Sequence, residues 1–163
     1  MSFFEWITIF ILTFCIMEFN AWFLHKYVMH GFLWVLHKDH HQPKDRWWQL
    51  NDFFALFFAI PSFLLILSNH LYDKPLNAAI GFGIMAYGAA YFFVHEVMIH
   101  RRLKFIKAST NWYSEAVNAA HKVHHSVKGK HHAENFGMLI VSMKYFKNAR
   151  KKHNGLRSRK AKT

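Results

Sequence analysis

The chain has 163 residues, of which 53% are hydrophobic and 18% aromatic, and its formal net charge is +12. This combination of apolar surface and positive charge argues against an ordinary water-soluble domain. The charge is also unevenly placed, because no Lys or Arg precedes Lys26 and no Asp or Glu follows Glu134. A single domain inserted in a membrane accounts for both features.

Three long apolar runs are predicted to cross the membrane as helices. They occupy about residues 6–24, 53–69 and 75–94. A helix needs about 20 apolar residues to cover the hydrocarbon core, and the first run reaches that length only when it includes Glu18. No basic segment or small-residue cleavage site accompanies this run, so we interpret it as a retained anchor rather than a signal peptide.

The C-terminal part is predicted to stay outside the bilayer. The apolar stretch from Phe136 to Tyr145 is too short to cross, and residues 136–146 are expected to form a helix in the interface or against the bundle. Residues 1–147 form the expected membrane domain. Residues 148–163 are basic and have no hydrophobic pattern, which predicts a disordered cytoplasmic tail near anionic lipid. Nucleic-acid binding is not expected, because no aromatic platform is interleaved with these charges.

The distribution of Lys and Arg predicts the orientation. Four basic residues lie between the first two spans, one lies between the second and third, and sixteen follow the third. Because basic loops stay in the cytoplasm, the N-terminus is expected outside and the C-terminus inside the cell (inner) membrane.

Histidines dominate the segments that follow the first and third spans. Ten of the fourteen fall in blocks that repeat two spacings, H-x4-H and H-x2-H-H. The blocks are His25/His30, His37/His40/His41, His95/His100 and His121/His124/His125. With the orientation above, all of them lie at the cytoplasmic ends of the spans.

Helix geometry accounts for part of this spacing. Positions i, i+3 and i+4 lie within roughly 100° of arc, so each H-x2-H-H block is expected to share a helical face. The i, i+5 pairs are about 140° apart on a regular α-helix. Either the helix loosens there into a π-type turn or the two residues of each pair serve different metal ions.

The number of histidines favours a two-metal centre. Neutral imidazoles buried without partners would each cost several kcal/mol, and a metal removes that cost by taking their lone pairs. Imidazole suits iron, zinc, copper and nickel, but a four-coordinate structural zinc site needs far fewer ligands. Ten nitrogens divide as five per ion, which leaves one open position on six-coordinate iron for O₂. The expected fold is therefore all-α, an integral membrane helical bundle with a cytoplasmic histidine-rich di-metal cap.

Four sequence words resemble the histidine boxes of bacterial-type β-carotene 3-hydroxylases, in the fatty acid hydroxylase/sterol desaturase superfamily of membrane di-iron enzymes. They are "HKYVMHG", "LHKDHH", "VHEVMIHRR" and "AHKVHH". Further similar words are Asn51–Asp52, Ala86 to Gly88, Val127 to Lys130 and Phe136–Gly137. The resemblance covers roughly residues 5 to 140. The sequence departs from the family at Glu96, where Asp is common, and at the paired His131 and His132.

The resemblance implies an activity and its cofactors. Two non-haem iron ions would use O₂ and electrons from an external donor, such as ferredoxin with its NAD(P)H-dependent reductase. The reaction would hydroxylate carbon 3 of β-ionone rings and convert β-carotene through β-cryptoxanthin to zeaxanthin. The substrate would enter from the bilayer, and membrane lipid would be a further partner.

Three carboxylates outside the histidine set are expected to support it. Glu18 lies inside the first span, where an acidic residue is costly, and it is expected to bond an imidazole, the substrate channel or a neighbouring helix. Asp39 and Glu96 adjoin ligand histidines and are expected to orient their rings. Residues His70 and His153 are interpreted as bystanders, and we predict that the pair His131 and His132 does not bind metal.

Two other functions fit part of the pattern. A fatty acid or sterol hydroxylase or desaturase would use the same histidine boxes. A histidine-rich metal transporter or a haem electron carrier is a remoter alternative, because a transporter should carry polar residues through its spans, and only Glu18 does so.

Overall fold

The computed structural model describes residues 1–42, 48–106 and 111–160. The described residues are helical or irregular, with no strand among them. The elements, in chain order, are α1 (Phe3–Phe23), η1 (Leu24–Phe32), α2 (Trp34–His41), η2 (Leu50–Phe53), α3 (Phe54–Tyr72), α4 (Pro75–Tyr91), η3 (Phe92–Ile99), α5 (Trp112–His125) and α6 (Met143–Lys160).

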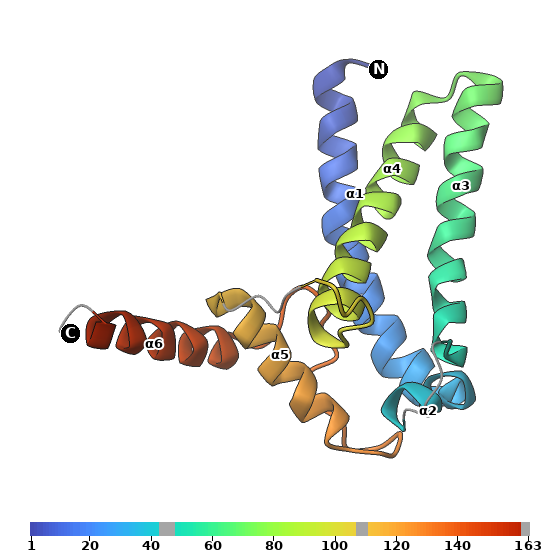
Figure 1. Cartoon of the computed structure of the whole chain (residues 1–163). Coiled ribbons are helices and arrows are strands. Elements are labelled where there is room, and N and C mark those ends of the chain that lie inside the picture. Colours follow the sequence, from blue (N-terminus) through green and yellow to red (C-terminus); the bar gives the residue numbers. More distant parts are fainter. Residues whose placement is uncertain (43–47, 107–110, 161–163) are drawn as a thin grey trace.

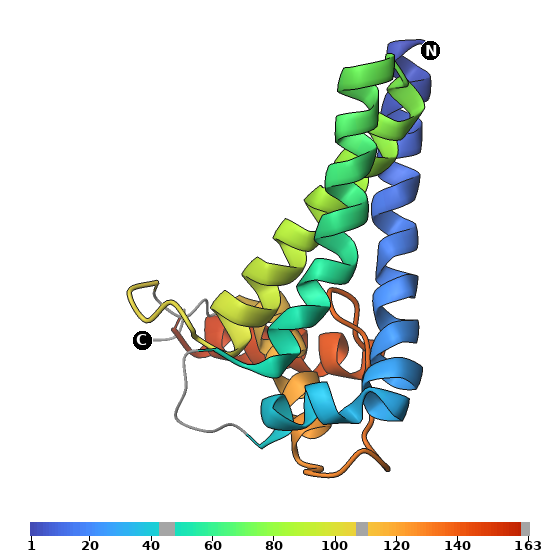
Figure 2. The same cartoon turned by 90° about the vertical axis from the view of Figure 1, so that its right-hand side faces the viewer.

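Three continuous helical segments are long and apolar enough to cross a membrane. They are Phe3–Phe32, Leu50–Tyr72 and Pro75–Ile99. These segments contain the three predicted spans, and each is longer than expected. Helices α1, α3 and α4 stand side by side, with the N-terminus and the α3–α4 turn at one end (Figures 1 and 2). Helices α2 and α5 lie together at the other end, where the histidines are.

Small residues bring the spans into close contact. A Cβ on Gly81 would lie 2.9 Å from the carbonyl oxygen of Ser62, and a Cβ on Gly83 would lie 2.7 Å from the Cβ of Thr13. The Ser62 hydroxyl donates a 2.8 Å hydrogen bond to the carbonyl of Gly81. Membrane helices associate through such small residues and interhelical hydrogen bonds. These contacts fix α4 against both α3 and α1, and so set the positions of the two segments that carry the H-x4-H pairs.

Both H-x4-H pairs lie in π-helix. Segment η1 contains His25 and His30, and η3 contains His95 and ends directly before His100, whose N–H donates to the carbonyl of His95 at 2.9 Å. This i→i+5 bond defines a π-turn and brings residues five apart onto one face. Of the two alternatives predicted for these pairs, the structure therefore confirms the π-type turn. Near the end of η1, Gly31 leaves the helical region (φ −104°, ψ −121°) and turns the chain toward α2.

The prediction of a helix over residues 136–146 is wrong for residues 136–142. Residues 136–142 are irregular, and α6 begins only at Met143. The backbone N–H groups of Met138, Leu139 and Ile140 donate to the carboxylate of Glu18 at 3.0–3.1 Å instead of to helix carbonyls. A side chain from another helix thus replaces the bonds that a helix would have made here.

Helix α6 also differs from the predicted disorder of residues 148–163. It continues to Lys160 and projects sideways from the bundle (Figure 1), while residues 161–163 lie outside the described part. Its Phe146 packs against Trp112 and Tyr113 of α5, each with ring centroids 6.0 Å apart. Lys, Arg and Ala are good helix formers, so a short apolar contact at the N-terminal end suffices to anchor a basic helix that shows no hydrophobic period.

Candidate metal centre

The structure gathers the box histidines into two adjacent groups, and in each the nearest ring nitrogens lie within 4.8 Å of one another. The first group comprises His25, His30, His37, His41 and His124. The second group comprises His40, His95, His100 and His121. The tenth residue, His125, lies between them, with its ring centroid 4.3 Å from those of both His121 and His41.

Each half of the chain contributes one histidine to the group that is formed mainly by the other half. His40, from the first half, joins the second group, and His124, from the second half, joins the first. Residues i and i+4 are only about 40° apart on a helix, whereas residue i+3 lies about 60° to the other side of i. In each H-x2-H-H block the i+3 member points to the neighbouring group, whereas His37, His41 and His121 stay with their own half and His125 lies between the groups. The expectation that each block shares one face is met only for its i and i+4 members.

Every ring of the first group is held through its Nδ1 atom. Backbone carbonyls or an amide oxygen accept from it at 2.6–3.1 Å. The pairs are His25 with Phe136 O, His30 with Lys130 O, His37 with Asn51 Oδ1, His41 with Val127 O and His124 with Glu134 O. Since a carbonyl can only accept, each of these Nδ1 atoms carries the proton and each Nε2 presents a lone pair.

One segment provides most of these acceptors. The residues that follow α5, 127–136, supply four of the five carbonyls and wrap over the first group. The backbone reaches this shape through left-handed conformations at His132 (φ 67°) and Asn135 (φ 60°). The side chains of His131 and His132 are exposed and lie outside both groups. This stretch therefore contributes its backbone, and its histidine side chains take no part in either group.

The second group has fewer such contacts. His40 Nδ1 pairs with Gln49 Oε1 at 3.0 Å, and His95 Nδ1 with Glu96 Oε1 at 2.7 Å. Within the described residues, no acceptor lies against Nδ1 of His100, His121 or His125. Glu96 is buried and its second oxygen meets Arg102 at 2.9 Å, so the carboxylate links a ligand ring to a cation near the surface.

The Nε2 atoms of the first group converge without protons to share, because His25 faces His37 and His30 faces His124, each at 3.2 Å between Nε2 atoms. In the second group, Nε2 of His121 lies 2.9 Å from Nε2 of His100. The buried Nε2 atoms of His40 and His125 have no hydrogen-bond partner. Lone pairs aimed at one another in a buried site need a cation between them. An all-imidazole donor set suits iron, zinc, copper or nickel.

Burial keeps these rings neutral. It lowers the pKa of His41 and of His100 to about 4, and it holds the pKa of His37, His40 and His121 well below its usual value. A metal ligand must be the neutral imidazole. The rings are thus in the binding form at neutral pH before any metal arrives.

The three expected supporting carboxylates behave differently. Glu96 bonds a box histidine directly, as expected for a residue that orients a ring. Asp39 instead accepts from the backbone N–H of Leu50 at 2.6 Å, and so holds η2, whose Asn51 bonds His37. Glu18 bonds no imidazole; it accepts from the Tyr87 hydroxyl of the neighbouring helix α4 (2.8 Å), one of the expected alternatives, and from the backbone of residues 138–140.

Several contacts of the histidines could not be predicted from the sequence. Gln49 carried no signal, and the word Asn51–Asp52 marked a resemblance without revealing that Asn51 bonds a ligand. The words Val127 to Lys130 and Phe136–Gly137 likewise marked a resemblance without revealing that backbone carbonyls in this stretch accept from the histidines. His70 is exposed at the opposite end of the bundle and His153 lies in α6, so both are outside the two groups.

The chain is similar to proteins of one kind. The family model described as fatty acid hydroxylase matches residues 10–147. A "Beta-carotene hydroxylase" of Pantoea ananas is 39% identical over 125 residues, which is 77% of this chain and 71% of the relative. A "Beta-carotene hydroxylase" of Paracoccus sp. (strain N81106 / MBIC 01143) is 33% identical, over 79% of this chain and 80% of the relative. The "Beta-carotene 3-hydroxylase, chloroplastic" of an Oncidium hybrid cultivar is 38% identical over 69% of this chain and 38% of its own. No solved structure matches significantly.

Proposed function

The chain belongs to the fatty acid hydroxylase family, and on that premise we propose that it is a membrane oxygenase that hydroxylates carotenoid rings. One observation carries the proposal. Two all-imidazole groups meet at the end of a three-span bundle, in a chain related over most of its length to bacterial proteins named beta-carotene hydroxylase.

The two groups would hold two iron ions, five nitrogens to each when His125 is counted with the second group. This assignment of His125 follows its i, i+4 relation to His121 on α5. The ions would supply the activation of O₂. The protein's own part is to fix the orientation of the rings whose Nδ1 has an acceptor, to leave the Nε2 of those rings unprotonated and to hold the donors in a buried site.

The substrate class follows from the relatives and from the location of the site. We propose carbon 3 of the β-ionone ring as the position hydroxylated, with β-carotene converted through β-cryptoxanthin to zeaxanthin. A hydrocarbon of this kind dissolves in the bilayer, and the histidine groups lie at the end of the spans where a ring could reach them. A fatty acid or sterol is the second candidate, favoured by the description of the family itself.

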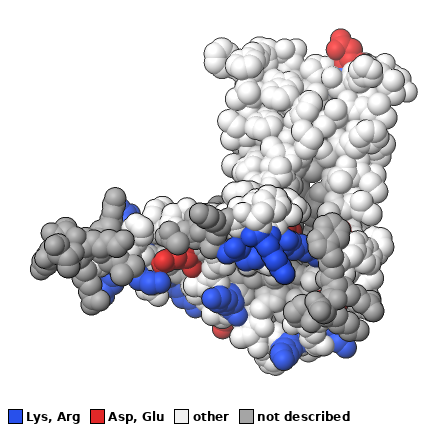
Figure 3. Space-filling model, in the orientation of Figure 1, with Lys and Arg blue, Asp and Glu red and all other residues white. Residues whose placement is uncertain are grey.

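Orientation and the electron donor are part of the proposal. Lys and Arg gather around α5, α6 and the histidine end, whereas the surface of the spans is almost free of charge (Figure 3). We place this basic end in the cytoplasm of a cell with the protein in its inner membrane. An acidic donor of the ferredoxin type, with its NAD(P)H-dependent reductase, would dock there. Turnover with such a donor is expected to fall as salt rises, because screening acts over about 8–10 Å.

The test is product formation in cells. In a bacterium that accumulates β-carotene, the wild-type chain should yield zeaxanthin through a singly hydroxylated intermediate. The His124→Ala variant should yield none, whereas the His70→Ala variant, changed at the opposite end of the bundle, should match wild type. Unchanged β-carotene despite membrane-inserted, iron-loaded protein would reject the carotenoid substrate, and hydroxylated acyl chains or sterols would select the second candidate.

A further inference from the structure

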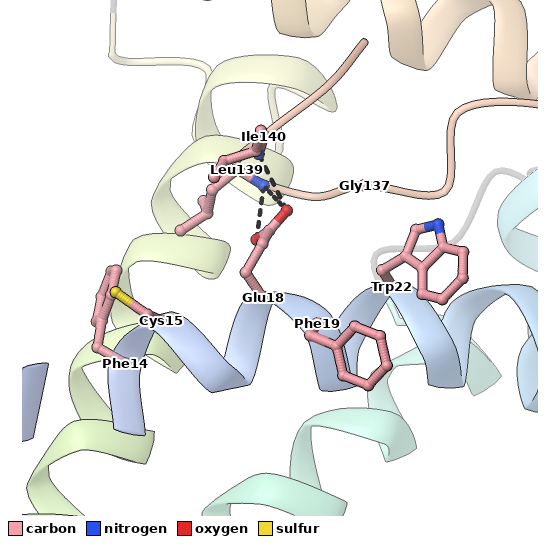
Figure 4. Close-up of a pocket in the computed structure, with 8 residues that line it drawn as sticks. All are labelled: Phe14, Cys15, Glu18, Phe19, Trp22, Gly137, Leu139 and Ile140. Atoms are coloured by element: carbon pink, nitrogen blue, oxygen red, sulfur yellow. Dashed lines mark hydrogen bonds between the residues drawn. The ribbon is translucent and has the colours of Figure 1, made fainter. Parts of the chain in front are cut away.

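A groove of about 450 Å³ runs along the outside of α1, on the half that leads to the histidines. One wall is a face of α1, and the other is the irregular segment before α6 (Figure 4). The apolar lining comprises Phe14, Cys15, Phe19 and Trp22 from α1 with Leu139 and Ile140 from the segment. Phe19 is 60% exposed and Ile140 65%, so the groove opens toward the surrounding lipid.

The polar group in this groove is already satisfied. Glu18 forms part of the lining, but its oxygens accept from the N–H groups of Met138, Leu139 and Ile140 and from the Tyr87 hydroxyl (Figure 4). The wrap of the segment around this carboxylate is so tight that a Cβ on Gly137 would collide with the carbonyl oxygen of Ile140. The carboxylate therefore builds the wall and leaves an apolar surface for an occupant.

The groove and the first histidine group share one wall. Phe136 directly precedes Gly137 in the groove lining, and its ring centroid lies 5.1–5.4 Å from those of His25, His30 and His124. Its carbonyl also holds His25. Along α1, Trp22 lies three residues before His25, a rise of about 4.5 Å. A molecule lying in the groove thus has one end beside Phe136 and the metal ligands.

We propose that this groove binds one end of the carotenoid substrate and guides its ring toward the first histidine group, with Phe136 as the side chain between them. The inference rests on the proposed function. Flat aromatic side chains line much of the groove, which favours a rigid conjugated hydrocarbon over a flexible acyl chain. From Phe14 to Trp22 the groove is about 12 Å long, so the rest of a long polyene stays in the bilayer.

The experiment compares a substitution that fills the groove with a matched one that does not. Cys15→Trp adds bulk inside the groove. Ile16→Trp adds an indole at the neighbouring position, which is 56% exposed and outside the lining. Binding of β-carotene to the detergent-solubilised full chain is followed by the circular dichroism induced in the visible band of the pigment. Iron content, KM and kcat are measured on the same samples.

We expect Cys15→Trp to lose the induced signal and to raise KM by about tenfold, equivalent to about 1.4 kcal/mol, with iron content and kcat retained. Ile16→Trp should behave as wild type. Phe19→Ala, which removes a wall without adding volume, should also weaken binding. Equal KM and equal induced signal in Cys15→Trp and wild type would overturn the proposal, as would equal losses in Cys15→Trp and Ile16→Trp. Loss of a tightly held phospholipid from Cys15→Trp, with no induced signal in wild type, would assign the groove to lipid.

The outcome separates this proposal from the proposed function. A wild-type chain that binds β-carotene in the groove but forms no hydroxylated product would reject the function and keep the site. A chain that forms product with the same KM in all of these variants would keep the function and reject the site.

Discussion

The two histidine groups differ in how their rings are held. In the first group every Nδ1 donates to a protein acceptor, mostly to backbone carbonyls of the segment after α5. In the second, only His40 and His95 have such partners among the described residues. A hydrogen bond from Nδ1 to a fixed protein acceptor restricts rotation of the ring and raises the basicity of the other ring nitrogen. Among the described residues the first group is thus the more fully supported, and we predict that it is the more rigid of the two sites.

The largest expected effect tests the exchange of ligands between the halves. Replacing His124 with Ala removes a ligand of the first group although it lies in the second half of the chain, and His40→Ala does the converse. Each variant should lose nearly all product and about one iron per chain, since a ligand is replaced by water. The control is His131→Ala, which changes an exposed histidine in the segment 127–136. This variant should keep its product formation and its iron content. Normal iron in His40→Ala and His124→Ala would show that the exchange is not a feature of the working centre.

The next prediction compares the supporting bonds of the two groups. Gln49→Ala frees His40 in the less supported group, and Asn51→Ala frees His37 in the fully supported one. Loss of such a bond typically lowers metal affinity by about 10–100-fold. We expect Gln49→Ala near the upper end of that range and Asn51→Ala near the lower end, measured by competition with a chelator. The reverse order would contradict the predicted difference in rigidity between the two sites.

A smaller effect is expected at Glu96. Its carboxylate joins His95 to Arg102, so Glu96→Gln keeps the shape but loses the charge that orients the ring. Metal affinity of the second group should fall by about tenfold. Glu96→Asp, which restores the charge on a shorter side chain, should recover part of it. If Gln and Asp behave alike, the residue acts through packing and not through its charge.

The smallest effect concerns the metal-free fold and pH. Burial lowers the pKa of His41 and His100 to about 4, against about 6.5 in an unfolded chain. Between these values the unfolded state binds more protons, so stability is fully present above about pH 6.5 and declines as pH falls toward about 4. Chemical unfolding of the metal-free chain in detergent should show this decline. Bound metal should shift the decline to lower pH, because it competes with protons for the same nitrogens.

Much of this architecture could be predicted from the sequence, and the features that could not be predicted have identifiable physical reasons. Apolar length predicted the three spans, and the H-x4-H spacing allowed the π-turns that are found. The exchange of His40 and His124 was implicit in the H-x2-H-H spacing, but it becomes visible only once two such helices face each other. Three of the carbonyls that hold the first group lie in sequence words shared with the family, but a backbone carbonyl can belong to any residue type, so the words did not reveal its role.

Glu18 and α6 show the remaining limits. An acidic residue in a span signals a function, but its partners here are backbone N–H groups 120 or more positions away in the chain. Nothing local in residues 136–142 reveals that a distant carboxylate will take their hydrogen bonds and keep them out of a helix. In α6 the aromatic contact with α5 comes from Phe146 in the first turn, and a contact confined to so few positions leaves no hydrophobic period in the sequence.

The metal content of the wild-type chain tests the central claim most directly. The full chain is loaded with ferrous iron without oxygen, freed of loosely bound metal, and analysed for iron per chain together with its Mössbauer spectrum. The two imidazole groups, with His125 assigned to the second as proposed, predict about two irons per chain in nitrogen-rich sites. They also predict two distinguishable environments, because the groups are supported differently. One iron per chain, or a preference for a single zinc ion under competition, would contradict the two-group centre.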